Sequence, residues 1–236
     1  MSKHRSKRYQ KAAALVEPGK SYSLNDAIGI VKQFPAPKFT PTVTLSFHLG
    51  VDPRKSDQMV RGSVSLPHGT GRTVRVAVFA QGAAAEAALA AGAEFVGYED
   101  LIKKVQEGFT DFDSAIATPD AMAEVRKIAR ILGPRGLMPN PKTGTVTDDT
   151  AKAVKEVKAG RIDFKLDKNA NISGGIGKVD FAPEQLRENG RAFIEAVVRA
   201  KPAAAKGNFL RSATLAATML PGVPLEAAEY IKAATH

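Results

Sequence analysis

The segment SVSLPHGTGRTVRVAVF, residues 63–79, marks the boundary between two architectures in this chain. Residues 63–66 alternate polar and apolar side chains, as a half-buried strand does. They run into Pro67-His68-Gly69-Thr70-Gly71, whose two glycines predict a turn or a hinge. The valine-rich strand 73–79 that follows belongs to a different pattern, so a second domain begins here.

After this boundary the chain alternates short strands with helices. We expect strands at 73–79, 95–97 and 114–117, and helices at 83–91, 98–107 and 121–132. Strands that alternate with helices are typical of a parallel sheet flanked by helices. The sequence therefore predicts an inserted, Rossmann-like α/β domain over residues 73–158.

The two ends of the chain share another pattern. The stretch TVTLSFHL, 42–49, alternates polar and apolar residues, and 161–166 does the same. Helices are expected at 24–33 and 183–200, and a further strand at 209–215. We therefore predict one α+β domain built from residues 1–72 and 159–236. The expected hinge glycines lie in the two crossings between the domains: Gly69, Gly71 and Gly160.

The positive charge lies in the two ends. Residues 73–158 hold 11 Lys and Arg against 12 Asp and Glu, whereas the flanking segments hold 23 against 12. A basic surface of this kind indicates a polyanionic partner, which the ends are expected to bind. The first 20 residues are predicted to be a loose basic arm that meets phosphate through Lys3, Arg5 and Arg8; a solvated, solubilising tail is the alternative.

Composition excludes several classes of protein. The 236 residues suffice for two domains, and no run approaches the roughly 18 apolar residues that span a bilayer. The N-terminal segment has charges but no apolar stretch before a cleavage site, so we expect neither export nor a membrane partner. Because the chain has no Cys, thiolate metal sites and disulfides are excluded, which favours the cytoplasm.

Catalysis has little support in the sequence. The four histidines, His4, His48, His68 and His236, have neither metal-ligand spacing nor a nearby nucleophile. The run Gly174–Lys178 only approaches a phosphate-binding loop, because Val179 takes the place of the hydroxyl residue, and it reads better as a glycine-rich strand or turn. We therefore expect no catalytic residue, no metal and no cofactor.

The proline-rich loop 132–142 is long for a compact domain, and loops of this length are usually functional. It offers Arg135 and Lys142 as candidates for a second contact with phosphate or RNA. A structural cover over the sheet edge is the alternative.

Four long motifs resemble the bacterial ribosomal protein L-one family. They are VDPRKSDQMVRGSVSLPHGTG (51–71), VAVFAQGAAAEAALAAGAEFVGYEDL (76–101), ILGPRGLMPNPKTGTVT (131–147) and IGKVDF (176–181). The resemblance implies a structural protein of the large subunit, monomeric when free, whose terminal domain grips a helical region of large-subunit rRNA at the mobile stalk. It also implies contacts with exit-site tRNA, with other ribosome components, and with the messenger RNA of its own operon, whose translation the protein would repress.

The same resemblance implies an RNA-binding set, namely Lys38, Phe39, Thr42, Asp167, Lys168, Ser212, Thr218, Met219 and Leu220. Duplex RNA is read across its shallow minor groove, which suits short hydroxyl side chains. For Phe39, a place in the core is the alternative. The chain departs from the family at Pro41 and Thr44, where acids are common, and at Leu220, where the family has glycine. Pro221-Gly222 then offers a second place for the tight turn.

Two rival functions remain at this point. A nucleotide- or sugar-phosphate-binding enzyme could be built on the inserted domain, although its glycine fingerprint is absent. A free-standing translational repressor would use the same RNA surface without joining ribosomes.

Overall fold

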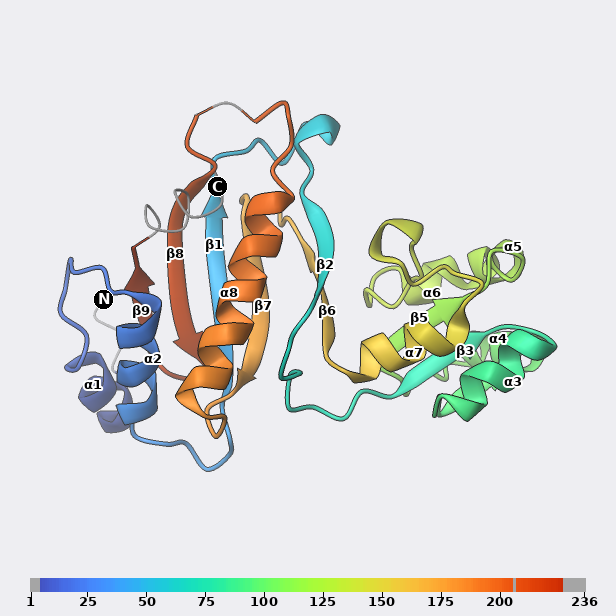
Figure 1. Ribbon diagram of the computed structural model, residues 1–236, viewed down its shortest axis with the longest axis horizontal. Helices are drawn as coiled ribbons and strands as arrows, with labels where there is room; N and C mark the ends of the chain where they lie inside the picture. The colour runs from blue at the N-terminus through green and yellow to red at the C-terminus, as the bar shows by residue number, and fades with distance from the viewer. Residues whose placement is uncertain (1–4, 206, 227–236) are drawn as a thin grey trace. The chain divides into compact units, whose positions relative to one another are not determined.

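A computed structural model describes residues 5–205 and 207–226, the side chain of Lys142 excepted. Its internal contacts divide the chain into two compact units (Figure 1). Unit 1 comprises Met1–Gly71 and Ile162–His236, and unit 2 comprises Arg72–Arg161. The predicted fold class is confirmed, because an antiparallel α+β part contains both chain ends and a parallel α/β part lies between them. That each unit folds as an independent domain stays a prediction.

Unit 1 is built on a four-stranded antiparallel sheet in the order β7-β1-β8-β9. The strands are β1 (Thr42–Leu49), β7 (Asn171–Lys178), β8 (Leu210–Ala217) and β9 (Gly222–Leu225). Two helices, α2 (Leu24–Gln33) and α8 (Pro183–Arg199), pack against one face of it (Figure 1). The opposite face of the sheet carries no helix among the described residues.

The core of unit 1 follows from the alternation in β1. Every second side chain of this strand is buried, from Val43 to Leu49, and Phe47 meets Phe193 of α8 with ring centroids 5.7 Å apart. The absent side chain of Gly174 in β7 makes this approach possible, because a Cβ there would lie 2.6 Å from Cζ of Phe193. Removing the Phe193 ring would cost roughly 3–5 kcal/mol of stability.

Helix α2 begins and ends where the sequence predicts. The Ser23 hydroxyl accepts a hydrogen bond from the Asp26 backbone amide at 3.2 Å, which caps the first turn. Leu24, Ala27, Ile28 and Val31 form its buried face. Phe34 leaves the helical conformation just before Pro35, as expected for a residue that precedes proline.

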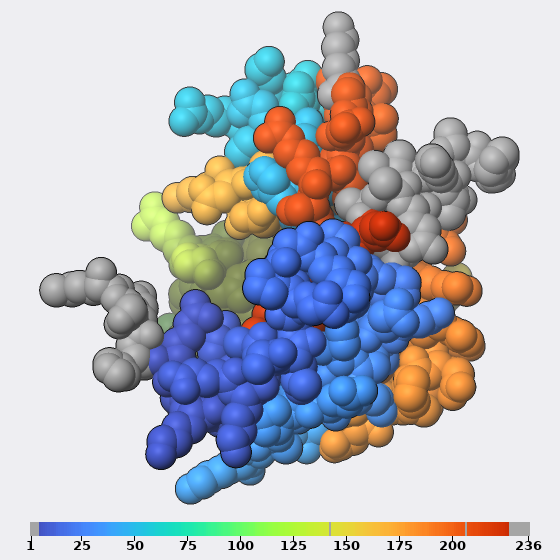
Figure 2. All heavy atoms as spheres, turned by 90° about the vertical axis from the view of Figure 1, so that its left-hand side faces the viewer, coloured from blue at the N-terminus to red at the C-terminus, as the bar shows by residue number. Residues whose placement is uncertain are grey.

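The N-terminal segment is not a loose arm over its described part. Residues Lys7–Ala13 form helix α1, which is capped by Ser6, and Ala12 is fully buried in the core. The segment continues into α2, and together they form a bulky body on the surface of unit 1, in blue in Figure 2. The prediction of a loose arm is therefore wrong over residues 7–13. A helix of 7 residues is too short to give a clear periodic pattern in the sequence, and its stability comes from tertiary packing.

Unit 2 contains the parallel sheet β4-β3-β5, formed by β3 (Val76–Phe79), β4 (Phe95–Gly97) and β5 (Ser114–Ala117). Val76 and Val78 pack with α3 (Ala83–Ala90) and α7 (Thr150–Lys158). Ala77 and Phe79 face the other side, where α4 (Glu99–Gln106) lies. The predicted helix 121–132 is divided into α5 (Met122–Val125), η2 (Arg126–Ile128) and α6 (Ala129–Leu132).

Five described elements were not predicted: α1, α7, β9, and the short turns η1 (Ser56–Gln58) and η3 (Pro141–Thr143). Strand β7 was anticipated only over residues 174–178, as a glycine-rich strand or turn. Two further strands, β2 (Arg61–Ser65) and β6 (Arg161–Lys165), pair as a two-stranded ribbon and lead to the crossings between the units.

Asn189 of α8 holds the first crossing against unit 1. Its side chain is fully buried, and its Oδ1 accepts a hydrogen bond from the His68 amide at 3.0 Å. Its Nδ2 donates to the carbonyls of Gly69, at 2.9 Å, and Ile176, at 2.8 Å. His68 itself lies 2.7 Å from Glu188, measured from Nε2 to Oε2. The chain is thus fastened to unit 1 as far as Gly69.

The three expected hinge glycines all have left-handed backbones, with φ of 66° at Gly69, 69° at Gly71 and 107° at Gly160. A Cβ at Gly71 would also lie 2.9 Å from the Phe181 ring. Other residues adopt this conformation only with strain. The backbone conformation alone therefore accounts for glycine at these three positions, with or without hinge motion. Their role as hinges stays a prediction.

We expect Asn189→Ala to lower the free energy of unfolding by about 3 kcal/mol, because it leaves the buried Ile176 carbonyl and the part-buried Gly69 carbonyl and His68 amide without their partner. Urea denaturation followed by far-UV circular dichroism measures this loss. Asn169→Ala, on the exposed loop between β6 and β7, is the control and should cost less than about 0.5 kcal/mol. Equal losses in the two variants would contradict the structural role of Asn189.

Candidate RNA-binding surface

The face of the unit 1 sheet that the helices leave open carries small and hydroxyl side chains in rows across the strands. This surface, called the open face here, is defined by the strand register and contains Gly175-Thr44-Ala216-Gly222, Ser173-Ser46-Thr214-Pro224 and Asn171-His48-Ser212. It includes neither a carboxylate nor a large apolar side chain among these residues. The rows are therefore flat, polar and close to the backbone.

Hydrogen bonds between neighbouring strands order these side chains. The Ser46 and Ser173 hydroxyl oxygens lie 2.9 Å apart, and His48 Nδ1 lies 3.0 Å from Asn171 Oδ1. A depression of about 310 Å³ lies over these rows and is also lined by Asp167 and Ser212. Hydroxyl groups both donate and accept hydrogen bonds, so this surface suits a ligand rich in hydroxyl and phosphate oxygens.

Two exposed apolar side chains mark the end of the open face where β1 begins. Phe39 is 49% exposed and Met219 is 68% exposed. Thr218 ties this end together: its amide donates to the Thr42 carbonyl at 3.1 Å, and its hydroxyl accepts from the Thr42 amide at 3.3 Å. The alternative that Phe39 is a core residue is therefore wrong.

The turn after β8 lies at Thr218-Met219. The Leu220 amide donates to the Ala217 carbonyl at 3.0 Å, and Met219 has φ of 65°. A left-handed residue other than glycine costs of order 1 kcal/mol or more. The Leu220 side chain is half-buried and packs inward, against the core of unit 1. The turn has not moved to Pro221-Gly222, because Gly222 pairs with Ala216 inside β9.

At the other end of the open face, Asp167 organises the loop between β6 and β7. Its Oδ1 accepts from the amides of Asn169, at 2.8 Å, and Asn171, at 2.7 Å, while Oδ2 accepts from Asn171 Nδ2 at 3.2 Å. The hydrogen bond from the Asn171 amide, supported by that from Asn169, lowers the pKa of Asp167. This acid therefore shapes the hairpin that presents the exposed Lys168.

The expected cations of the N-terminal segment lie in different settings. Arg8 donates to the Met219 carbonyl at 3.4 Å, which places α1 beside the Thr218-Met219 turn. Arg5 lies over the Tyr9 ring, 4.6 Å from its centroid, and Lys38 is exposed. Lys3 lies outside the described residues.

In unit 2, the loop 132–142 serves at least partly as a cover, because Leu137 and Met138 pack against the core. Arg135 is exposed and donates a hydrogen bond to the Thr110 hydroxyl. The side chain of Lys142 lies outside the described residues. These two cations stay candidates for a second RNA contact.

No metal centre emerges from the described part of the chain, where no group of three or more His, Asp or Glu side chains gathers suitably. Among those same residues, no helix is long and apolar enough to cross a membrane. Sequence reasoning missed Asn171, Ser173 and Thr214, which complete the open face. Thr214 lies within the strand predicted at 209–215, whereas Asn171 and Ser173 lie just before the glycine-rich run 174–178, outside any predicted strand.

Asp167→Ala should lower the urea midpoint at pH 7, and this loss should shrink as the pH is lowered through the acid range. The folded pKa of Asp167 lies below its unfolded value, so its contribution is present above the unfolded pKa and disappears as the pH falls through the folded one. Asp57→Ala, on exposed η1, is the matched control and should leave the midpoint unchanged. Equal midpoints for Asp167→Ala and the natural protein at pH 7 would refute the loop-ordering role.

Comparison with known proteins places these features in one family. Residues 31–221 match the ribosomal protein L1p/L10e family. The chain is 55% identical over 221 residues to the large ribosomal subunit protein uL1 of Salinispora tropica, which covers 94% of this chain and 93% of that protein. It is 52% identical over 222 residues to the protein of the same name from Clavibacter michiganensis, covering 94% and 97%.

The uL1 protein of Protochlamydia amoebophila gives the same result, being 52% identical over 224 residues, which is 95% of each chain. These matches extend across both units. They confirm the expectation of a structural protein without enzymatic activity and set aside the nucleotide-binding enzyme. The chain belongs to the ribosomal protein L1p/L10e family.

Proposed function

We propose that this protein is a constituent of the large ribosomal subunit that binds large-subunit rRNA through the open face of its unit 1 sheet. The observation that carries the proposal is the combination of hydroxyl rows on β1, β7 and β8 with exposed Phe39 and Met219 at their end. Its relatives are named as large-subunit ribosomal proteins, which supports the same assignment.

The chemistry of the open face suits a helical RNA. The minor groove of A-form RNA is wide and shallow and displays 2′-hydroxyls, which proteins recognise mainly by shape and by short polar contacts. Thr44, Ser46 and Thr214 are short enough to let the sugar edges approach the sheet backbone. Met219 and Phe39 add apolar contact to sugars or a base, and Lys38 and Lys168 are exposed to meet phosphates.

Three finer roles follow from the family resemblance. The protein would occupy the mobile stalk beside the tRNA exit site, assist the release of exit-site tRNA, and repress its own operon by binding the messenger RNA. It would act in the cytoplasm on ribosomes and be a monomer when free. A free-standing repressor would use the same open face, and only sedimentation with large subunits separates the two functions.

Phe39→Ala and Met219→Ala should each weaken binding to large-subunit RNA about tenfold at every salt concentration, because they remove apolar contact without changing charge. Filter binding with the full chain measures the affinity. Leu89→Ala is the control, since Leu89 is equally apolar and 58% exposed but belongs to unit 2. Unchanged affinity in both variants would count against the proposed surface.

Arg5→Gln combined with Arg8→Gln should make the log–log dependence of affinity on salt shallower by about 0.7–0.9 for each phosphate that is no longer neutralised. The matched control is Lys103→Gln with Lys104→Gln, which removes two cations from α4 of unit 2. If the control pair changes the slope as much as the arginine pair, the basic ends are not the principal phosphate-binding region.

A further inference from the structure

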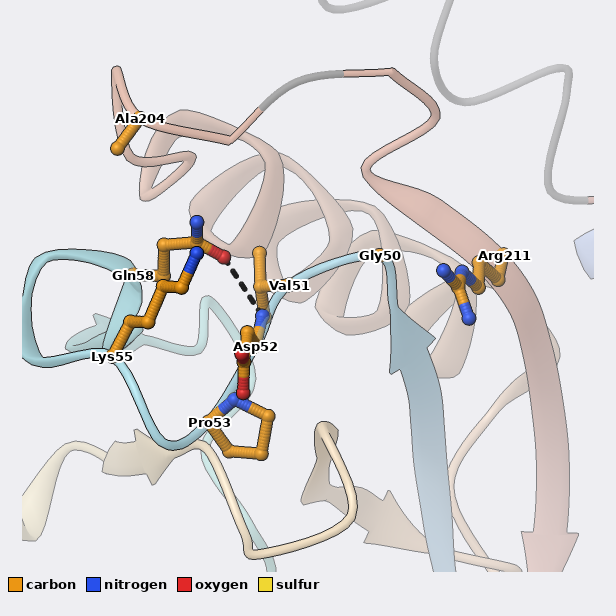
Figure 3. A pocket seen from close by; sticks show the side chains of 8 residues that line it. All are labelled: Gly50, Val51, Asp52, Pro53, Lys55, Gln58, Ala204 and Arg211. Carbon is orange, nitrogen blue, oxygen red and sulfur yellow. Dashed lines mark hydrogen bonds between the residues drawn. The ribbon is translucent and has the colours of Figure 1, made fainter.

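The segment VDPRKSDQM, residues 51–59, contributes no residue to the rows of the open face. Its polar residues form a loop that is closed by internal hydrogen bonds. The Asp52 amide donates to Gln58 Oε1 at 2.8 Å (Figure 3), and Asp52 Oδ1 accepts from the Arg54 amide at 3.0 Å. The Lys55 amide donates to the Asp52 carbonyl at 3.1 Å. The loop is thus held in this shape by hydrogen bonds between its own residues.

This loop forms one side of a groove of about 460 Å³, called the Met59 groove here. Its lining consists of Pro53, Met59, Lys165, Leu166, Asp167 and Lys168. The Leu166 amide donates to the Val60 carbonyl at 2.9 Å, which fixes the two sides relative to one another. Met59 is 39% exposed, so it offers apolar surface to a ligand in the groove.

The charges around the groove favour an anionic ligand. Lys165 and Lys168 are both exposed, and within the described ranges neither takes part in an ion pair. The one carboxylate of the lining, Asp167, already accepts three hydrogen bonds from its own loop. An apolar floor between two cations that form no ion pair is suited to a flat, uncharged ring flanked by phosphates.

The Met59 groove also adjoins the proposed RNA surface. Asp167 lines both the groove and the depression over His48, Asn171 and Ser212. On its other side, Pro53 is shared with the pocket of Figure 3, which is lined by Lys55 and Arg211. The polar surface therefore continues past the end of the sheet instead of stopping at the Asp167 loop.

We infer that the Met59 groove binds an unpaired nucleotide of the same RNA whose helical part lies on the open face. The base packs on Met59 and Pro53, and the phosphates on either side of it meet Lys165 and Lys168. Paired bases are stacked and cannot enter such a groove, whereas unpaired bases are free to leave the stack, and a thioether packs well against a ring. The inference rests on the proposed function, because it assumes that the open face binds RNA.

Binding measurements with the full chain and transcribed large-subunit RNA test this groove. Met59→Ser should weaken binding about fivefold and leave the salt slope unchanged. Lys165→Gln with Lys168→Gln should make the slope shallower by about 0.7 for each phosphate released, the value for single strands. Leu89→Ser, a comparable exposed residue of unit 2, is the control and should change neither quantity.

A photo-crosslink locates the contact directly. A benzophenone amino acid in place of Met59 should attach to unpaired nucleotides beside a helical region, whereas the same group in place of Leu89 should not. Attachment within a duplex, attachment to another ribosomal protein in reconstituted subunits, or natural affinity in Met59→Ser would each overturn the inference.

The outcome for Phe39→Ala separates this inference from the proposed function. If Phe39→Ala weakens binding while Met59→Ser does not, the Met59 groove is wrong and the open face stands. If neither variant weakens binding, the proposed RNA surface fails and the groove fails with it.

Discussion

The packing of α8 against the sheet of unit 1 is the constraint on which the rest of the structure depends. Phe193 inserts between Phe47 and Phe164, at centroid distances of 5.7 and 5.8 Å, over a position where β7 has glycine. Because this helix and α2 bury one face of the sheet, the alternate side chains of every strand must point away from the core. A one-sided sheet of this kind leaves a whole face available for a partner.

What that face can bind is decided by the size of its side chains. Rows of Ser, Thr and Gly keep the surface close to the backbone, which large or charged residues would prevent. Both ends are then shaped by local hydrogen bonding. Thr218 fastens the turn that exposes Met219, and Asp167 fastens the loop that exposes Lys168. Local hydrogen bonding also shapes the loop 51–59, where the bond from the Asp52 amide to Gln58 Oε1 lies next to the exposed Met59.

Sequence reasoning was most successful where one physical signal dominated. The alternation of residues 42–49 predicted both the buried and the open side of β1, and the helix expected at 24–33 has the bounds of α2. It failed where the signal is weak or non-local. Glycines left β7 ambiguous between a strand and a turn, because Gly174 is required by the approach of Phe193 and glycine is not favoured by strand propensity. Helix α1 is stabilised by burial of Ala12, and the turn at Met219 by Thr218, neither of which is a local pattern.

The central claim is that RNA lies on the open face of the unit 1 sheet, and a structure of the full chain bound to large-subunit RNA tests it most directly. The account predicts that the minor groove of a helical region lies across the rows centred on Ser46, with Met219 and Phe39 at one edge and Lys168 at the other. Contact of the RNA with the α2 and α8 side of unit 1, or with unit 2 alone, would contradict it.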